Sequence, residues 1–224
     1  MCLILVAWRT HANFPLIVAA NRDEYHARPA SAAAFWPDHP GILAGRDLQA
    51  QGTWLGVSRN ARFASVTNYR GGRDPDATTS RGALVTGFLL DSESPEAYMS
   101  KLFKKKDSYS GFNLLVADRS ELWWLSNRAE GARRLEPGCH ALGNDLLDTP
   151  ELLPIKARFA QAPAAAEPLF SLLADAKIVA PAYGTRCASV LLAHGGGRIQ
   201  FCERPFDPAG NAGATLRYEF AGAG

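Results

Sequence analysis

The second residue of the chain, Cys2, is the side chain best suited to chemistry. If Met1 is removed, Cys2 becomes the N-terminus and carries both a thiol and a free α-amine. An α-amine has a reference pKa of about 7.7–8.0, so it serves as a base near neutral pH. A thiol with its own base is an activated nucleophile, by the logic that applies to an N-terminal threonine. The alternative is that Cys2 is a small apolar residue packed at the start of a buried strand.

Charged residues follow the second apolar run of the chain. The quartet Asn21-Arg22-Asp23-Glu24 ends a run that begins at Leu16. Because the connection to the first run is short, we expect Arg22 and Asp23 to lie near Cys2. An arginine there lowers a thiol pKa by favouring the thiolate, and a carboxylate orients the thiol or the amine. The alternative is an ordinary turn with a surface ion pair, worth about 0–1 kcal/mol.

Three later polar residues are also candidates for the site. Asn68 and Asn144 stand close to glycines, where a side-chain amide can donate to the oxyanion that develops on a carbonyl under attack. Asparagine near glycine is equally a common turn former. Arg186 precedes a strongly apolar run, and its guanidinium can bind a carboxylate in a bidentate manner or hold other site residues.

Hydrophobic patterns predict the elements that must position these residues. Strands are expected at 2–8, 16–21, 41–44, 53–58, 62–68, 112–117, 122–126, 188–193, 198–202 and 216–220, with a loop over 25–42. Helices are expected from Thr79 or Ser80, from Ser94-Pro95-Glu96, and within 149–175, where Pro154, Pro163 and Pro168 interrupt the pattern. Because strands and helices occur in separate blocks, the sequence predicts an α+β fold of two stacked, mainly antiparallel sheets with helices outside.

Length and composition favour one domain over residues 1–224. With 47% hydrophobic residues the chain can build a core, and a net charge of +2 gives no electrostatic footprint for nucleic acid. The one basic cluster, Lys104-Lys105-Lys106, suits the end of a helix. The chain has no apolar run of about 18 residues, so no transmembrane segment is expected. The four cysteines lack close pairs, which predicts neither zinc site nor disulfide scaffold. A cytoplasmic protein is the default expectation, and the oligomeric state stays open.

Several motifs together resemble the NRDE family, also called the transport and Golgi organisation protein 2 family. They are Met1-Cys2, Asn21-Arg22-Asp23-Glu24, Thr67-Asn68-Tyr69-Arg70, residues 112–118, residues 142–150, Tyr183-Gly184-Thr185-Arg186 and residues 203–207. They occur in the family's order from Met1 to about Asp207. Two departures are Glu151-Leu152-Leu153, where the family usually has Trp-Pro-Lys, and Cys187, which replaces a hydroxyl residue.

This family is similar to the cysteine N-terminal nucleophile hydrolases, which include penicillin V acylases and bile-salt hydrolases. The resemblance implies a four-layer α-β-β-α sandwich in which Cys2 attacks a non-peptide amide without a cofactor. Arg22 and Asp23 match residues that support the nucleophile, although these are usually not adjacent. Asn68 and Asn144 match the asparagines of the oxyanion site, and Arg186 matches a late site arginine.

The same resemblance implies an alternative function. The family is linked to intracellular haem movement and to lipid homeostasis, so the chain is either an amidohydrolase or a non-catalytic haem- or lipid-handling protein on the same fold. Haem needs an axial ligand beside an apolar slot. Cys2, His11 and His26 are the candidate haem ligands, and the five histidines show no metal-ligand spacing. The predicted partner is a small-molecule amide or haem.

Overall fold

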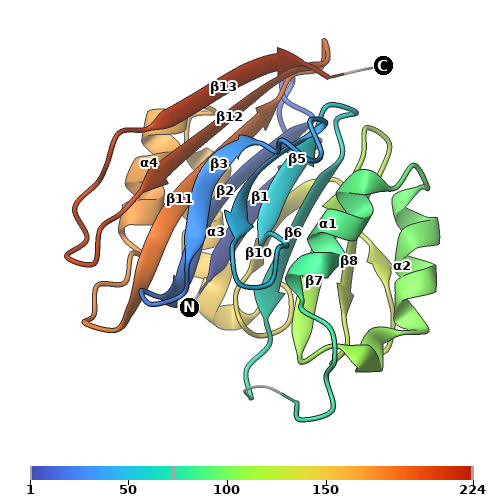
Figure 1. The fold of residues 1–224 in the computed structure, drawn as a ribbon. Helices are drawn as coiled ribbons and strands as arrows, with labels where there is room; N and C mark the ends of the chain where they lie inside the picture. The colour runs from blue at the N-terminus through green and yellow to red at the C-terminus, as the bar shows by residue number, and fades with distance from the viewer. Residues whose placement is uncertain (1, 72–73, 223–224) are drawn as a thin grey trace.

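A computed structural model describes residues 2–71 and 74–222, so Met1, on whose removal the free amine of Cys2 depends, falls outside the described residues. Two antiparallel sheets lie face to face (Figure 1). In spatial order the six-stranded sheet contains β10 (Gly138–Leu142), β1 (Leu3–Trp8), β2 (Leu16–Tyr25), β11 (Tyr183–Ala193), β12 (Arg198–Pro205) and β13 (Leu216–Ala221). The seven-stranded sheet contains β3 (Ala30–Phe35), β4 (Ile42–Asp47), β5 (Leu55–Ser58), β6 (Phe63–Asn68), β7 (Phe112–Ala117), β8 (Leu122–Ser126) and β9 (Arg133–Arg134).

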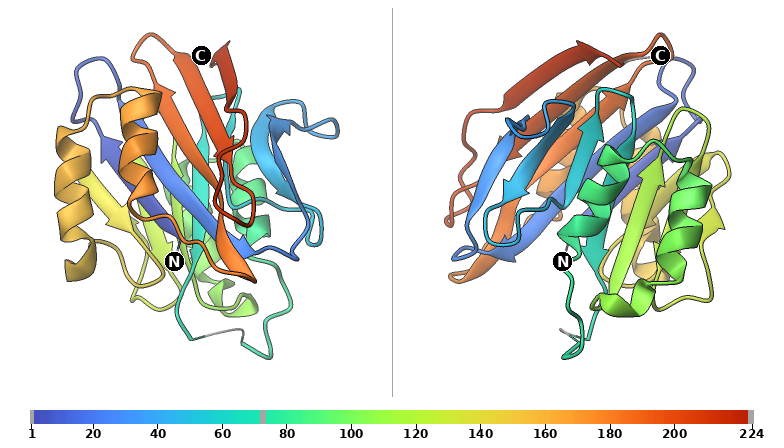
Figure 2. Two further views of the ribbon diagram at one scale, coloured as in Figure 1. Left: turned by 90° about the vertical axis from the view of Figure 1, so that its left-hand side faces the viewer. Right: turned by 45° about the vertical axis from the view of Figure 1, so that its right-hand side comes forward.

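Helices cover the outer face of each sheet, as both views in Figure 2 show. Helices α3 (Leu153–Gln161) and α4 (Ala166–Ala174) contact the six-stranded sheet, whereas α1 (Gly82–Leu90) and α2 (Pro95–Phe103) contact the other. Short 3-10 turns lie at Lys106–Ser108 and Pro150–Leu152. The predicted α+β sandwich of two stacked antiparallel sheets with outer helices is confirmed. Within residues 2–71 and 74–222, no helix has both the length and the apolar character that a bilayer crossing requires.

Strand alternation divides the core into an inner layer and an outer layer. Ile4 and Val6 of β1 pack between the two sheets, while Leu3 and Leu5 pack beneath α3 and α4. Successive side chains of a strand point to opposite faces. Cys2, two residues before Ile4, therefore belongs on the side that faces the other sheet.

The charged quartet does not follow the second strand, as the sequence predicted, but lies inside it. Strand β2 continues to Tyr25 because its distal half pairs with β11, where Asp23 stands opposite Thr185. Val18 and Ala20 face the inner layer, so Arg22 and Glu24 share that face. Asn21 points the other way, and its Nδ2 donates to the Leu173 carbonyl of α4 at 2.9 Å. The adjacent residues Asn21 and Arg22 therefore point into different layers of the fold.

Other differences from the predicted elements have local causes. The expected loop 25–42 contains β3, whose alanine-rich sequence has little intrinsic β preference. The sequence patterns also missed β9 and β10. Pro154 and Pro168 do not interrupt helices but lie in the first turns of α3 and α4, where a backbone N–H lacks a helical acceptor anyway.

The two helices on the seven-stranded sheet begin differently. Ser94 caps α2 by accepting the Ala97 N–H at 3.2 Å, with Pro95 as the first helical residue, as predicted. The cap of α1 is instead Arg81, whose side chain makes no capping hydrogen bond.

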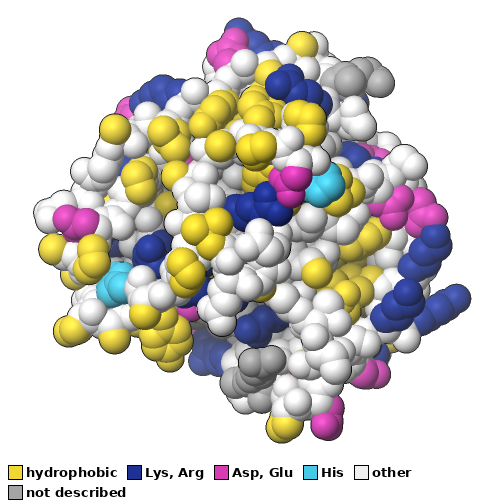
Figure 3. All heavy atoms as spheres, viewed as in Figure 1, with side chains coloured by type: hydrophobic (Ala, Val, Ile, Leu, Met, Phe, Trp, Pro, Cys, Tyr) yellow, Lys and Arg dark blue, Asp and Glu magenta, His cyan; other side chains and the backbone are white. Residues whose placement is uncertain are grey.

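In Figure 3, basic side chains gather at the right-hand edge beside α2. Lys104, the residue that caps the C-terminal end of α2, lies where the helix dipole favours cations.

Candidate active site

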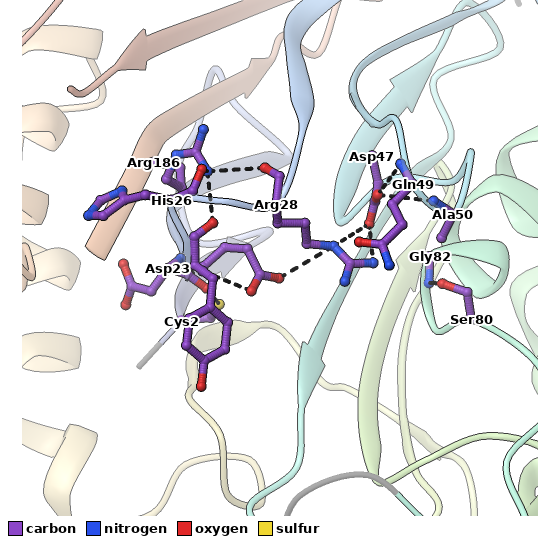
Figure 4. Close-up of polar contacts among 12 residues, drawn as sticks. Cys2, Asp23, His26, Arg28, Asp47, Gln49, Ala50, Ser80, Gly82 and Arg186 are labelled. Atoms are coloured by element: carbon purple, nitrogen blue, oxygen red, sulfur yellow. Dashed lines mark hydrogen bonds and ion pairs between the residues drawn. The ribbon is translucent and has the colours of Figure 1, made fainter. Parts of the chain in front are cut away.

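Cys2 is half-buried at the start of β1 and contacts the backbone of Asp23 on β2 (Figure 4). The Asp23 N–H donates to the Cys2 Sγ at 3.4 Å, and the thiol donates to the Asp23 carbonyl at 3.4 Å. The antiparallel register explains this contact, because Leu3 pairs with Asn21 and the preceding Cys2 therefore stands opposite Arg22. The register between the two paired strands therefore places the thiol beside the quartet.

The thiol borders a cavity of about 110 Å³ between the ends of the two sheets. Four of the residues predicted for the site line this cavity, namely Cys2, Arg22, Asp23 and Asn68. They come from β1, β2 and β6, so both sheets contribute to the wall. Ser80, Arg81 and Gly82, at the start of α1, line the cavity as well.

The Cys2 thiol has a raised pKa in this environment. Burial, and after it the negative charge of Asp23, raise the pKa of Cys2 from 9.0 to about 11. The Asp23 backbone contact and the positive charges of the N-terminus and Arg22 act in the opposite direction. At neutral pH the thiol is therefore protonated, and attack on a carbonyl requires a base. The stabilisation from keeping the thiol neutral is present below about pH 9 and is lost as the pH rises through about 11.

Asp23 is held in place from the neighbouring strand. Its Oδ1 accepts the Thr185 hydroxyl proton at 2.6 Å, and that hydroxyl oxygen accepts the Ile178 N–H at 2.8 Å. Thr185 stands opposite Asp23 in the ladder between β2 and β11. This arrangement fixes the backbone amide and carbonyl that contact the thiol.

The two candidate asparagines occupy different positions. Asn68 lines the cavity at the end of β6, but Asn144 does not line it. Instead, the Asn144 Nδ2 donates to the Asn68 carbonyl at 2.7 Å, and the Asn144 carbonyl accepts the Arg70 N–H at 2.8 Å. Asn144 therefore holds the backbone on either side of Asn68's neighbour, Tyr69.

Arg186 also lies outside the cavity lining. It occupies a bulge of β11 between Thr185 and Cys187. Its Nη1, which carries two N–H groups, lies within hydrogen-bond distance of three backbone carbonyls at and after the end of β2, those of Tyr25, His26 and Arg28, at 3.0, 3.2 and 3.2 Å (Figure 4). Arg186 thus positions the segment that carries Arg28.

Arg28 is a cavity residue that the sequence patterns did not identify. Its guanidinium reaches across to β4, where NH2 lies 2.6 Å from Asp47 Oδ2, and Glu24 lies 3.8 Å from Arg28 Nε. Burial opposes ionisation of Asp47, but hydrogen bonds from Arg28 and from the backbone amides of Ala50 and Gln49 lower the Asp47 pKa. The ion pair joins the two sheets at the cavity. An isolated arginine in an expected loop carried no signal of this role.

The candidate haem ligands His11 and His26 do not line the cavity. His11 lies in the connection between β1 and β2, at the opposite end of β1 from Cys2, and its Nδ1 accepts the Asn13 N–H at 3.2 Å. The Nε2 of His26 lies 3.0 Å from the Ala180 carbonyl. In the part of the chain that the structure describes, no group of three or more His, Cys, Asp or Glu side chains is arranged to hold a metal ion.

The Arg186 contacts lead to a prediction about local mobility. Replacing Arg186 with glutamine leaves three backbone carbonyls without the charged Nη1 that they share, and one hydrogen bond to a charged group contributes about 1.5–3 kcal/mol. We expect amide hydrogen exchange at His26 and Arg28 to become at least about tenfold faster. Arg59→Gln is the matched control, because Arg59 also donates to a carbonyl, that of Pro40, on the exposed surface. Equal exchange in the two variants would contradict the positioning role.

Solved structures share this fold with the chain. One is a Caenorhabditis elegans N-acylethanolamine-hydrolyzing acid amidase ortholog, with a TM-score of 0.58 and 11% identity over 85% of this chain and 92% of that chain. Another is the mutant C2A of the conjugated bile acid hydrolase from Clostridium perfringens, with a TM-score of 0.55 and 7% identity over 98% of this chain and 92% of that chain. At these identities the likeness concerns the fold.

Sequence comparison identifies the family. The human Transport and Golgi organization protein 2 homolog is 31% identical over 255 residues, which cover 92% of this chain and 92% of that protein. The family model for Transport and Golgi organisation 2 matches residues 1–176. The chain therefore belongs to the Transport and Golgi organisation 2 family.

Proposed function

We propose that this chain hydrolyses a small-molecule amide at a non-peptide C–N bond, with Cys2 as the nucleophile. The observation that carries the proposal is the position of the Cys2 thiol, which borders a polar cavity and contacts the Asp23 backbone. The fold shared with an N-acylethanolamine-hydrolyzing amidase and a conjugated bile acid hydrolase supports it. The test is intact-mass spectrometry after incubation with amides, which detects an acyl group attached to Cys2.

The first half of the reaction forms an acyl-enzyme. Removal of Met1 gives Cys2 a free α-amine, which takes the thiol proton as Sγ attacks the carbonyl carbon. The Sγ–C bond forms and the carbonyl π electrons move to oxygen, which becomes a tetrahedral oxyanion. When the oxyanion collapses, the C–N bond breaks, and the α-ammonium returns the proton to the leaving amine. The products of this half are a thioester on Cys2 and a free amine.

The surrounding residues have roles that fit their positions. The Arg22 charge and the Asp23 N–H both favour the thiolate. Asn68 lines the cavity and serves as the oxyanion donor, while Asn144 holds its backbone. In the second half, the α-amine deprotonates a water that attacks the thioester carbon. The C–S bond breaks, which releases a carboxylic acid and regenerates the thiol.

The raised thiol pKa predicts how Cys2 alkylation depends on pH. Iodoacetamide reacts with the thiolate, so in the chain that retains Met1 the rate at Cys2 should keep rising up to about pH 11. In the processed chain the α-ammonium stands on Cys2 itself, and we expect the midpoint to move to lower pH. Peptide mass spectrometry measures the rates, with the partly buried Cys139 as an internal reference that Met1 removal leaves unchanged. The same midpoint in both forms would contradict the amine-base mechanism.

The alternative function, handling of haem or lipid without catalysis, has less support from the geometry. A haem needs an apolar slot with an axial ligand. The cavity beside Cys2 is about 110 Å³ and mainly polar, and neither His11 nor His26 lines it, so these residues do not fit a haem. A Soret band that shifts on addition of haemin, and is lost in Cys2→Ala, would favour the alternative.

The free state of all four cysteines supports a proposed cytoplasmic location, where thiols stay reduced.

A further inference from the structure

The cavity beside Cys2 is too small and too polar for a long acyl chain. Its volume of about 110 Å³ equals the share of roughly four water molecules in liquid water, whereas pockets for drug-sized ligands measure roughly 300–1,000 Å³. Trp54 and Val66 supply its large apolar side chains, and the charged residues of the wall are Arg22, Asp23, Glu24, Arg28, Asp47 and Arg81. An adjoining void on the inner side of Cys2 measures only about 20 Å³. A long hydrocarbon chain therefore finds little apolar surface to bury here.

One charge in this wall, that of Arg22, has no hydrogen-bond or ion-pair partner in the part of the chain that the structure describes. Arg22 is 7% exposed, and its guanidinium lies over the Trp54 ring with CZ 4.2 Å from the ring centroid. Among residues 2–71 and 74–222, its guanidinium makes no hydrogen bond and no ion pair. The buried Glu203 interacts with Arg22 electrostatically but forms no ion pair with it among the described residues, and its Oε1 accepts the Ala33 N–H at 2.7 Å.

The Arg22 side chain is largely buried and no described protein group accepts from its N–H donors, but its nitrogens are not among the fully buried unsatisfied atoms and so keep contact with solvent in the cavity. An acceptor that enters the cavity gains a charge-assisted hydrogen bond there. The neighbouring Arg28 differs, because Asp47 and Glu24 pair with it. Arg22 lines the cavity, so an anion entering the cavity is the acceptor that would satisfy it. A carboxylate presents two oxygens that match the guanidinium in a bidentate manner.

The opposite wall favours an anion as well. The nine-residue helix α1 begins at this wall, and its positive end carries Arg81 as the cap with no acidic residue in the first turn. The positive end of the helix dipole therefore lies at the cavity wall, where it favours an anion. The Nη1 of Arg81 donates to the Gly111 carbonyl at 3.1 Å.

We infer that the substrate is a small amide that carries a carboxylate a few bonds from the scissile carbonyl, and that Arg22 binds this carboxylate. The amide part rests on the proposed hydrolysis. Cys2 and Arg22 stand opposite each other on neighbouring strands, where Cβ atoms are about 4.5–5.5 Å apart. A carboxylate on Arg22 therefore brings the carbonyl over Sγ only when few bonds separate them. The carboxylate belongs either to the acyl half, as in a half-amide of a dicarboxylic acid, or to the amine half, as in an N-acyl amino acid.

Binding to the Cys2→Ala variant tests the inference without turnover. Isothermal titration calorimetry compares succinamate and N-acetylglycine, which carry the carboxylate on opposite halves, with neutral N-acetylglycinamide and with decanoyl ethanolamide. We expect one of the two carboxylates to bind at least about tenfold more tightly than either neutral amide, which also identifies the half that carries it. Adding Arg22→Gln should abolish this preference. Adding Arg59→Gln should not, because Arg59 stacks on Phe35 at 4.1 Å outside the cavity.

The outcomes separate the inference from the proposed hydrolysis. Failure of both carboxylates to bind, equal binding of N-acetylglycinamide, tighter binding of decanoyl ethanolamide, or a preference that survives Arg22→Gln would each overturn the inference. If the Arg22→Gln variant does not fold, Arg22→Lys replaces it, because lysine keeps the buried positive charge. We expect its preference for the carboxylate over the neutral amides to lie between that of Cys2→Ala alone and no preference. If the carboxylates bind through Arg22 but the Met1-processed chain does not cleave them, the proposed hydrolysis is wrong and the inference about Arg22 holds. If the processed chain cleaves neutral amides as fast as carboxylates, the hydrolysis holds and the inference about Arg22 is wrong.

Discussion

Replacing Cys2 with alanine is expected to lower amide hydrolysis by the processed chain at least about 1000-fold. The variant loses the only protein atom in the proposed mechanism that forms a covalent bond with the substrate carbon. The fold should be little affected, because Cys2 is half-buried beside a cavity and precedes the first residue of β1. The measurements are the release of free amine and the mass of the intact protein, which should show no acyl adduct.

The matched control for this variant is Cys139→Ala. Cys139 is a partly buried free thiol on β10, the strand that pairs with β1 on its other side, where Cys139 stands opposite Ala7. It does not line the cavity. Hydrolysis by Cys139→Ala should stay within about twofold of the starting protein, as for substitutions away from a site. Full activity in Cys2→Ala, or an acyl group mapped to Cys139, would remove Cys2 from the mechanism.

Replacing Gly52 with alanine is expected to destabilise the fold by about 1–3 kcal/mol. A Cβ at Gly52 would lie 2.6 Å from the carbonyl carbon and 2.8 Å from the carbonyl oxygen of Gly82, the first residue of α1. These are backbone atoms, so the contact cannot be relieved by rotating a side chain. Either the chain after β4 or the start of α1 must move. For a chain of this length, each kcal/mol lowers Tm by about 2–4 °C, which calorimetry measures.

A second glycine provides the control for this steric effect. A Cβ at Gly41 would meet no atom within 4 Å, so Gly41→Ala should change the free energy of unfolding by less than about 0.5 kcal/mol. Gly82 also lines the cavity, so Gly52→Ala should reduce amide hydrolysis whereas Gly41→Ala should not. Indistinguishable Tm values for the two variants would mean that the Gly52–Gly82 contact tolerates a methyl group.

Most of the sheet framework was predictable because it depends on local patterns. Apolar runs predicted β1, β7 and β8 within about one residue, and two short apolar runs at 188–193 and 198–202 marked the paired strands β11 and β12. The distal half of β2 was missed because Arg22, Asp23 and Glu24 are charged and carry no strand pattern. Pairing with β11, a strand far along the chain, makes them part of the sheet.

The roles of the two candidate residues that do not line the cavity depend on backbone geometry. Arg186 precedes an apolar strand in the sequence, but the bulge between Thr185 and Cys187 turns its side chain toward the carbonyls after β2. Asn144 was expected at the oxyanion site, and its amide instead donates to the backbone of Asn68. Residue type indicated that each would make strong hydrogen bonds, whereas the acceptor depends on how distant strands meet.

By itself, the sequence determined that a thiol begins the first buried strand and that Arg22 and Asp23 lie next to it. Both follow from two apolar runs joined by a short connection. Only the tertiary structure decided that Arg22 lies over Trp54, that Arg28 pairs with Asp47, and that α1 begins at the cavity. Those contacts join the two sheets, and their geometry depends on how the sheets pack. No local pattern of residues encodes that packing, because it is the outcome of burying both inner faces at once.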